Sequence, residues 1–406
     1  MSRIDQLIEE LCPDGVKHEP ISKVGTFIRG GGPQKKDFTD VGVGCIHYGQ
    51  IYTYYGISAV ETNVFVSDDV ALKSRKASPG DVVIAVTSEN DEDLGKSVAW
   101  LGESPVAVSN HTLIFTSDLD SRFISYFLTS TSFHRQKQRF ITGTKVRALP
   151  ESAFGKIFIP VPPLPVQQEI VGILDIFTEL EAELEAELEA RKLQYEHYRR
   201  ELLDFSKNSS VEWSTLGEVS MRVSSGGTPS SQNPSYYGGD IPWLRTQEVD
   251  FNEIKSTGMT ITEKGLKNSS AKWIPANSVI VAMYGATAAK TAINAIPLTT
   301  NQACCNLQID PSKAEFRYVF HWISNCYHQL RSLGEGSQNN INSRKVKSFR
   351  IPLPTLEVQR SIVTVLDNFD SLVYDLSSGL PAEISARRKQ YEYYRDKLLT
   401  FKELSA

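Results

Sequence analysis

Two long stretches of the chain space their apolar residues alternately three and four positions apart. This spacing is typical of an amphipathic helix whose apolar stripe packs against a partner helix. In the first stretch the stripe consists of Ile170, Ile173, Phe177, Leu180, Leu184, Tyr195, Tyr198, Leu202 and Phe205. In the second it consists of Ile362, Val365, Phe369, Leu372, Leu376, Tyr391, Tyr394, Leu398 and Phe401. We therefore predict one spacer helix within residues 159–206 and another within residues 351–406.

The two stretches are copies of one another, because IPVPPLPVQQEI in the first matches IPLPTLEVQRSI in the second. They align at an offset of 192 as far as Leu184 and Leu376, and at 196 from Arg191 and Arg387 onward, so one copy carries four extra residues. Four residues are about one helical turn, which a helix can absorb without turning its apolar face away. A duplicated unit suits a pseudo-symmetric target, of which duplex DNA is the commonest.

Prolines precede both predicted helices, and the second helix also contains Gly379-Leu380-Pro381, which is expected to kink or break it near its middle. With two equivalent helices in one chain, antiparallel pairing buries both apolar stripes and leaves the globular regions at opposite ends. The alternative is that each stripe packs on its own globular region.

The globular regions also repeat. At an offset of 195, Val24 faces Val219, and Gly31-Gly32 faces Gly226-Gly227. Between such landmarks the copies share little, which indicates one scaffold with diverged surface loops.

A second landmark is DVVIA at residues 81–85, which parallels NSVIV at residues 277–281; both runs are typical of buried strands. Residues 121–140 and 315–333 are predicted to be helical. The fold class is therefore α+β, with two mixed α/β domains separated by two long antiparallel coiled-coil-like helices. The predicted parts are a helical segment (1–15), a first globular domain (16–158), a central spacer helix (159–206), a second globular domain (211–350) and a C-terminal spacer helix (351–406).

The net charge of −5 is distributed unevenly. Residues 163–205 carry 4 Lys and Arg against 11 Asp and Glu, whereas residues 211–350 carry 14 against 10, and residues 16–158 carry 16 against 15. The acidity thus belongs to the spacer helix, and the globular regions are compatible with phosphate contacts.

Other classes of protein are disfavoured. No apolar run approaches the roughly 18 residues of a membrane span, and the acidic residues of MSRIDQLIEEL are unlike a signal peptide, so we expect a cytoplasmic protein without a membrane partner. The five cysteines form no CxxC pair, so we expect neither disulfides nor a zinc site. NPSY at residues 233–236 resembles an amino-methyltransferase motif, but no glycine-rich cofactor turn precedes it. We predict no catalytic residues, metal or cofactor.

Candidate DNA contacts are loops that combine glycine with amide or basic side chains, because phosphates take cations and backbone N–H groups while bases take planar bidentate groups. Residues 30–36 (GGGPQKK) correspond to 226–232 (GGTPSSQ), and 143–147 (GTKVR) to 336–347 (GSQNNINSRKVK). The strand-end residues Arg245 and Gln247, and Tyr284 with Lys290, are further candidates; residues 87–90 are a weaker one beside the acidic Glu89, Asp91, Glu92 and Asp93. A solvated polar turn is the alternative for each loop. The candidates are Gly31, Gly32, Lys35, Lys36, Thr144, Lys145, Arg147, Gly227, Thr228, Arg245, Gln247, Tyr284, Lys290, Gln338, Asn339, Asn340, Asn342, Arg344, Lys345 and Lys347.

Several motifs together resemble the specificity subunits of type I restriction-modification enzymes over nearly the full chain. They are the two IPxPxxxVQ segments, the ELEA repeats, the GLPAEI turn, the QYExYRxxLLxF ends, and GGTPSSQNPSYYGGDIPWLRTQEV, ITEKGLKNSSAK and TTNQA in the second globular region. The first globular region departs more, since CIHYGQIYTYYG stands where the second has YYGGDIPW.

The resemblance implies a DNA-reading subunit with no catalysis of its own. Each domain would read one half of a bipartite target in double-stranded DNA, and the helices would fix the gap and dock two methyltransferase subunits; a separate restriction subunit, an ATP-dependent motor, would cut. S-adenosylmethionine would belong to the methyltransferase. The candidate partner-binding residues are Glu181, Glu185, Glu189, Tyr195, Tyr198, Tyr391 and Tyr394. A solvated helix flank is the alternative for the glutamates.

Two other functions stay open from the sequence. A helical adaptor that binds only protein, with the globular repeats as sugar or peptide receptors, is one. A methyltransferase in its own right is the other, and it would have to bind S-adenosylmethionine alone.

Overall fold

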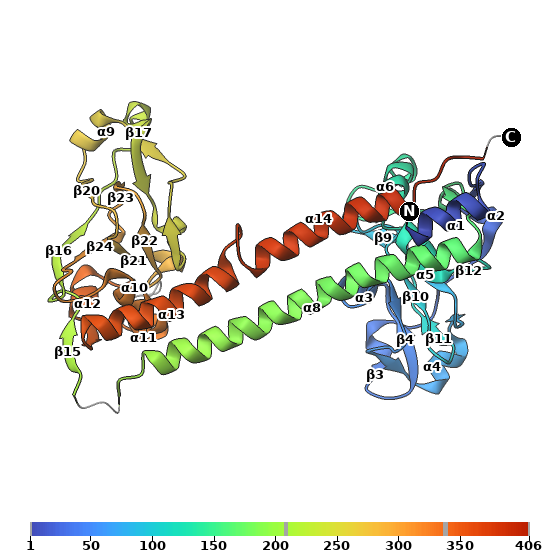
Figure 1. The fold of residues 1–406 in the computed structure, drawn as a ribbon, viewed down its shortest axis with the longest axis horizontal. Helices are drawn as coiled ribbons and strands as arrows, with labels where there is room; N and C mark the ends of the chain where they lie inside the picture. The colour runs from blue at the N-terminus through green and yellow to red at the C-terminus, as the bar shows by residue number, and fades with distance from the viewer. Residues whose placement is uncertain (1, 207–209, 336–339, 405–406) are drawn as a thin grey trace. The chain divides into compact units, whose positions relative to one another are not determined.

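The computed structural model of the chain describes residues 2–206, 210–335 and 340–404 (Figure 1). The chain folds into two compact units, the first made of Met1–Glu185 and Glu383–Ala406 and the second of Ala186–Ala382. Both ends of the chain therefore belong to the first unit. Val16 forms a parallel bridge with Glu403, and Leu399 is buried in the core of that unit.

The first unit packs two sheets face to face and covers one of them with helices. Its sheets have the orders β2-β12-β8-β10-β5 and β3-β6-β4-β11-β7, with the smaller pairs β1-β14 and β13-β9. Side chains alternate along β8: Val83 faces the second sheet, whereas Val82 and Ile84 face the helices. The strands are β1 (His18–Pro20), β2 (Gly25–Arg29), β3 (Phe38–Thr39), β4 (Val43–Ile46), β5 (Ser58–Ala59), β6 (Phe65–Val66), β7 (Lys76–Ala77), β8 (Val82–Ala85), β9 (Thr87–Ser88), β10 (Ser97–Trp100), β11 (Val106–Val108), β12 (Thr112–Ser117), β13 (Arg147–Ala148) and β14 (Phe158–Pro160).

Helices connect and cover these strands. They are α1 (Arg3–Leu11), α2 (Ile21–Val24), η1 (Lys35–Asp37), α3 (Tyr48–Thr53), α4 (Asp68–Lys73), α5 (Ser121–Phe127), α6 (Thr131–Lys137), η2 (Gln138–Phe140) and α7 (Glu151–Phe154). The helical prediction for residues 121–140 is thus confirmed as a broken run.

The second unit repeats the plan with fewer strands. Its sheets have the orders β16-β24-β21-β22-β18 and β19-β17-β23-β20, with the pair β15-β25. The strands are β15 (Glu212–Thr215), β16 (Ser220–Ser225), β17 (Tyr237–Leu244), β18 (Asn252–Ile254), β19 (Thr260–Ile261), β20 (Trp273–Ile274), β21 (Val279–Ala282), β22 (Thr291–Asn294), β23 (Leu298–Thr300), β24 (Cys304–Ile309) and β25 (Arg350–Leu353). The short helices are η3 (Pro234–Tyr236), η4 (Thr246–Glu248), α9 (Glu263–Lys267), η5 (Gly285–Thr287), α10 (Phe316–Asn325), α11 (Tyr327–Ser332) and α12 (Ser343–Ser348).

Strand register fixes which residues of the two units correspond. Ala85 pairs with Thr112 in the first unit as Ala282 pairs with Cys304 in the second. Strands β8 and β21 therefore match one residue later than the sequence alignment of 81–85 with 277–281 placed them. Gly80 and Asn277 then correspond, and both have positive φ (93° and 63°).

The alignment of the glycine pairs is also wrong by one residue. Gly25 pairs with Ser117 as Ser220 pairs with Ile309, so the alignment holds up to that point. A β-bulge between Ser220 and Arg222 then adds one residue to the second copy. Beyond it, Gly30-Gly31 and not Gly31-Gly32 corresponds to Gly226-Gly227.

The first spacer helix is uninterrupted, whereas the second is broken, as Figure 1 shows. Helix α8 (Leu164–Leu202) runs for 39 residues, while the second copy forms α13 (Leu356–Tyr374) and α14 (Leu380–Leu398). The break predicted near Gly379 and Pro381 is therefore confirmed. The expectation that a helical turn absorbs the four extra residues is wrong, because they fall where the helix is interrupted. Asp375 holds this turn by accepting hydrogen bonds from the Ser377 backbone N–H (2.7 Å) and the Ser378 hydroxyl (2.6 Å).

In each unit a helix of one copy packs antiparallel against a helix of the other. In the first unit the Phe177 ring lies 5.6 Å from that of Tyr394, and in the second the Tyr195 ring lies 5.9 Å from that of Phe369. The same apolar stripes also enter the globular cores, since Ile170 and Ile362 are buried there. Both arrangements considered from the sequence are thus present.

The middle of each stripe is not buried. Leu180 and Leu372 are 42% and 38% exposed, and Leu376 is 82% exposed. The prediction of a continuous buried seam is wrong here, because these side chains lie beyond the globular core and a single partner helix covers only part of a helix surface.

A buried glutamine fixes the start of each spacer helix. Gln167 Nε2 donates to the Pro162 carbonyl (2.7 Å), and its Oε1 accepts from the Asp120 N–H (2.8 Å). Gln359 does the same with Pro354 (2.9 Å) and Glu315 (2.9 Å). In each copy the glutamine of the duplicated VQ pair thus satisfies a carbonyl of the proline-rich turn and an N–H at the start of α5 or α10.

All five cysteines are buried, and none of them is in a disulfide. Among the described residues no helix has the length and apolar character that crossing a bilayer requires.

Replacing Gln167 with Leu should lower the free energy of unfolding by about 1–3 kcal/mol, because two buried backbone groups lose their partners. Gln168 is exposed and provides the matched control. Urea unfolding that shows equal stability for Gln167→Leu and Gln168→Leu would contradict this role.

Candidate nucleic-acid interface

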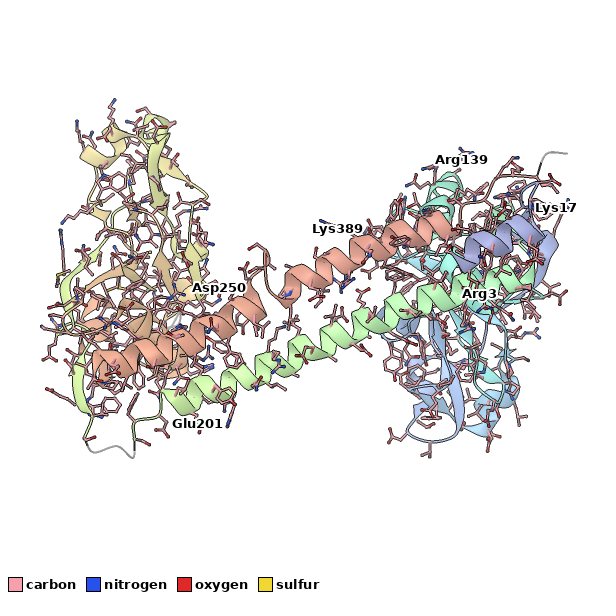
Figure 2. All side chains as sticks on the ribbon, in the orientation of Figure 1. Arg3, Lys17, Arg139, Glu201, Asp250 and Lys389 are labelled. Carbon is pink, nitrogen blue, oxygen red and sulfur yellow. The ribbon has the colours of Figure 1, made fainter. Side chains whose placement is uncertain are left out.

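Three loops of the second unit converge at one end of its central sheet. The return loop before α12 is tied to the loop after β21, because the Ile341 N–H donates to the Met283 carbonyl (2.9 Å) and the Asn340 side-chain oxygen accepts from the Gly285 N–H (3.1 Å). The loop after β17 joins them through the ion pair of Asp250 and Lys290 (2.5 Å). Asp250, the residue through which this loop is joined, is labelled in Figure 2.

The structure brings together most of the candidate readers of the second unit. Gln247 on η4 is exposed, and Tyr284 at the start of η5 is 43% exposed. Arg245 lies at the N-cap of η4, where its backbone N–H donates to Glu248 (3.2 Å) and its guanidinium is partly covered. The loops after β17 and β21 therefore present an amide, a phenol and a partly covered cation at this junction.

The return loop divides its polar residues between structure and surface. Asn342 caps α12 by accepting from the Lys345 N–H (3.1 Å). Lys345 donates to the Leu333 carbonyl and pairs with Glu335, whose pKa this hydrogen bond lowers. Arg344 and Lys347 are exposed and form no ion pair with the described residues. Gln338 and Asn339 lie outside the described residues.

The first unit builds the same junction. The Leu149 N–H donates to the Val86 carbonyl (3.0 Å), the counterpart of the bond between Ile341 and Met283. By this register residues 340–347 correspond to 148–155, so the predicted match of residues 143–147 with the whole of 336–347 is wrong; the remaining part, 336–339, lies outside the described residues. Here strand β13 pairs with β9, so the residue 87–90 loop lies beside Arg147.

Arg147 is held from two sides. Its Nε and Nη2 both donate to Asp91, the latter at 2.9 Å, and its Nη1 donates to the Gly143 carbonyl (2.6 Å). This hydrogen bonding lowers the pKa of the Asp91 carboxyl and raises that of Arg147. Thr144 and Lys145 are exposed in the same turn.

One element of this junction escaped the sequence alignment. Cys45 and Ile46 pair in parallel with Ala107 and Val108, as Trp243 and Leu244 pair with Thr299 and Thr300. Helix α3 therefore stands where the second unit has η4. Its Tyr52 hydroxyl donates to the Thr87 carbonyl (2.6 Å), which ties it to β9. The CIHYGQ segment shares no letters with IPWLRTQ beyond one isoleucine and one glutamine, so only strand register reveals the match.

The glycine-rich loops have a different setting. Gly227 is buried, and a Cβ there would lie 2.3 Å from the Ala271 nitrogen; a Cβ on Gly32 would lie 2.4 Å from the Ser74 hydroxyl. These glycines permit close packing against the segments that lead into β20 and β7. Of the side chains beside them, Lys35 and Lys36 on η1 are exposed, and Thr228 is exposed with its hydroxyl bonded to Gln302.

The candidate partner residues on the helices fall into two groups. Tyr195 is 2% exposed, so its side chain is part of the core, and Tyr391 is partly buried. Tyr198 and Tyr394, which correspond in the repeat, are 38% and 37% exposed.

The three glutamates have partners within the chain. Glu181 and Glu185 both pair with Arg388, and Glu189 pairs with Lys192 (2.6 Å). Arg388 and the first two glutamates therefore staple α8 to α14 within the first unit.

A buried polar cluster in the second unit has the residue types of a metal site. His321 Nε2 lies 2.7 Å from Asp367, and Asp370 is close by. Arg317 also bonds Asp367 (2.5 Å). Burial by itself would raise the pKa of the Asp367 carboxyl, but the hydrogen bonds with His321 and Arg317 outweigh burial, and the pKa is lowered. The corresponding cluster of the first unit is Tyr126, Asp175, Thr178 and Arg122, with Tyr126 donating to Asp175 (2.6 Å). We interpret both as polar joints between α5 or α10 and the spacer helix.

Comparison with known proteins gives a consistent family. The type I restriction modification DNA specificity domain matches twice, at residues 13–190 and 208–386. The EcoR124I/EcoR124II specificity subunit of Escherichia coli is 41% identical over 259 residues, which is 61% of this chain and 63% of that protein. A putative type I restriction enzyme specificity subunit of Haemophilus influenzae is 30% identical over 308 residues, which is 72% of this chain and 75% of that one.

Solved structures share the fold. A chain of a type I restriction-modification system covers 95% of this chain and 97% of its own length, with a TM-score of 0.66 at 17% identity. The HsdS subunit of Thermoanaerobacter tengcongensis covers 97% and 99%, with a TM-score of 0.53 at 17% identity. The α+β architecture with two repeated domains and long helices agrees with these structures. Because the family domain covers most of the sequence in two copies, the chain belongs to the type I restriction-modification DNA specificity subunits.

Proposed function

We propose that each unit of this specificity subunit reads one half of a bipartite site in double-stranded DNA. The observation that carries the proposal is the duplicated junction of three loops, which presents polar and cationic side chains once in each unit. Cations hold phosphates, and amides or guanidinium groups discriminate bases. In the second unit these are the exposed Gln247, Arg344 and Lys347, and in the first the exposed Thr144 and Lys145 with the partly exposed Arg147.

The parts of the chain take separate roles in this proposal. Residues 16–158 and 211–350 are the recognition domains, and residues 159–206 and 351–406 are the spacers that set the gap and dock the partners. Within residues 1–15, Arg3–Leu11 form the short helix α1 of the first unit. The chain supplies specificity alone, and two methyltransferase subunits and a restriction subunit supply the chemistry with their own cofactors.

A binding experiment separates this function from a protein-only adaptor. The chain, with and without a co-expressed methyltransferase, is incubated with a random duplex pool, and the retained DNA is sequenced. We expect the retained sequences to share two blocks separated by a fixed gap. Binding of methyltransferase without any selection of DNA would support the adaptor, and binding of S-adenosylmethionine by the chain alone would support a methyltransferase.

Recognition should be divided between the units. Arg344→Ala should relax bases in one half-site and Lys145→Ala in the other, each by about 1–3 kcal/mol if a base contact is lost. Sequencing the methylated sites of strains that carry each variant measures this. Relaxation of the same half-site by both variants would contradict the assignment.

The docking surfaces should be duplicated as well. Leu180 and Leu372 correspond in the repeat and are both exposed on spacer helices, where an apolar side chain gains from a partner. Leu180→Glu and Leu372→Glu should each reduce the complex from two methyltransferase subunits to one, as measured by native mass spectrometry.

Leu193 provides the control for this experiment. It is 70% exposed, but its counterpart in the other copy is Lys389, so Leu193→Glu should leave both subunits bound. Two bound subunits in all three variants would place the docking surface elsewhere.

The ELEA repeat should set the distance between half-sites. Residues 179–190 contain ELEA three times, and each unit adds about 6 Å to a helix that rises about 1.5 Å per residue. Because DNA rises about 3.4 Å per base pair, deleting residues 183–186 should shorten the gap by one or two base pairs and leave both half-sites unchanged. Methylome sequencing of the deletion strain measures the gap. An unchanged gap would contradict the proposal that the ELEA repeat sets the distance between half-sites.

A further inference from the structure

Arg147 differs from the other candidate cations in how it is held. A guanidinium has five N–H groups. Asp91 takes one on Nε and one on Nη2, and the Gly143 carbonyl takes one on Nη1. One N–H on Nη1 and one on Nη2 remain for a ligand.

The groups that hold Arg147 are themselves fixed. Lys137 is 1% exposed, and its ammonium donates to the Glu92 and Leu94 carbonyls (2.9 and 2.6 Å), which pins the loop that carries Asp91. Gly143 has a φ of +89°, and a Cβ there would lie 2.1 Å from the Val146 oxygen, so this tight turn requires glycine.

A fixed guanidinium edge selects a bidentate acceptor. In the major groove guanine offers two adjacent acceptors, O6 and N7, whereas adenine pairs one acceptor with a donor. The Arg147 side chain is 30% exposed, so part of it is accessible to a ligand. In the junction of the second unit, the cations that are held by ion pairs, Lys290 and Lys345, are point charges without a planar edge.

We infer that Arg147 reads a guanine in the half-site of the first unit and that Asp91 is its positioning residue. The inference rests on the proposed function, because it requires that the first unit contacts bases. A phosphate is the competing bidentate acceptor, and it would give Arg147 no sequence preference.

Substitutions that keep the charge separate the two acceptors. Arg147→Lys retains a cation but loses the bidentate edge, and Asp91→Asn retains Arg147 but weakens its orientation. In strains that carry each variant with its methyltransferase, methylome sequencing should show relaxation at one guanine of one half-site, by roughly 5- to 150-fold for Arg147→Lys. Asp91→Asn should relax the same position by less.

Arg139 provides the matched control, since it is an exposed arginine of the same unit, labelled in Figure 2. Arg139→Lys should leave the site unchanged. A uniform loss of methylation at all sites in Arg147→Lys indicates a phosphate contact and overturns the inference, as does relaxation at a base other than guanine or an unchanged site. If deleting the chain removes no methylated motif, the proposed function itself fails.

Discussion

The structure depends on a shared burial: neither unit closes its core with residues of one copy alone. Leu398, Leu399 and Phe401 from the second copy enter the core of the first unit. Tyr195, Leu202 and Leu203 from the first copy enter the core of the second. Each of these side chains is worth on the order of 1.5–3 kcal/mol when fully buried, so the two copies stabilise one another.

The packing of spacer-helix residues from one copy into the core of the other unit also determines which surface remains free to bind a ligand. One face of the central sheet of each unit packs against helices, and the other face packs against the second sheet. Loops can therefore diverge without loss of core packing only at the end of this sandwich. There, two of the three loops are joined by backbone hydrogen bonds, those of Leu149 to Val86 and Ile341 to Met283, and the third is joined through the side chain of Tyr52 in the first unit and the Asp250–Lys290 ion pair in the second. Main-chain groups thus make the tie that both units share, and the side chains that make the other tie differ between the units.

Periodic features were predictable and local irregularities were not. The 3.6-residue pattern predicted both spacer helices, and glycine with proline predicted the break between α13 and α14. A single bulged residue beside Ser220 shifted the glycine alignment by one, because a bulge has no reliable sequence signature. The burial of Tyr195 and the exposure of Leu180 depend on where the globular cores end along α8, which periodicity does not encode. The match of α3 with η4 likewise required strand register.

The central claim is that two equivalent units read DNA independently. Exchanging residues 211–350 for the matching segment of the Haemophilus influenzae relative, followed by sequencing of the methylated sites, tests it most directly. The account predicts that one half-site changes while the other half-site and the gap are preserved. A change in both half-sites, or a single continuous target, would contradict it.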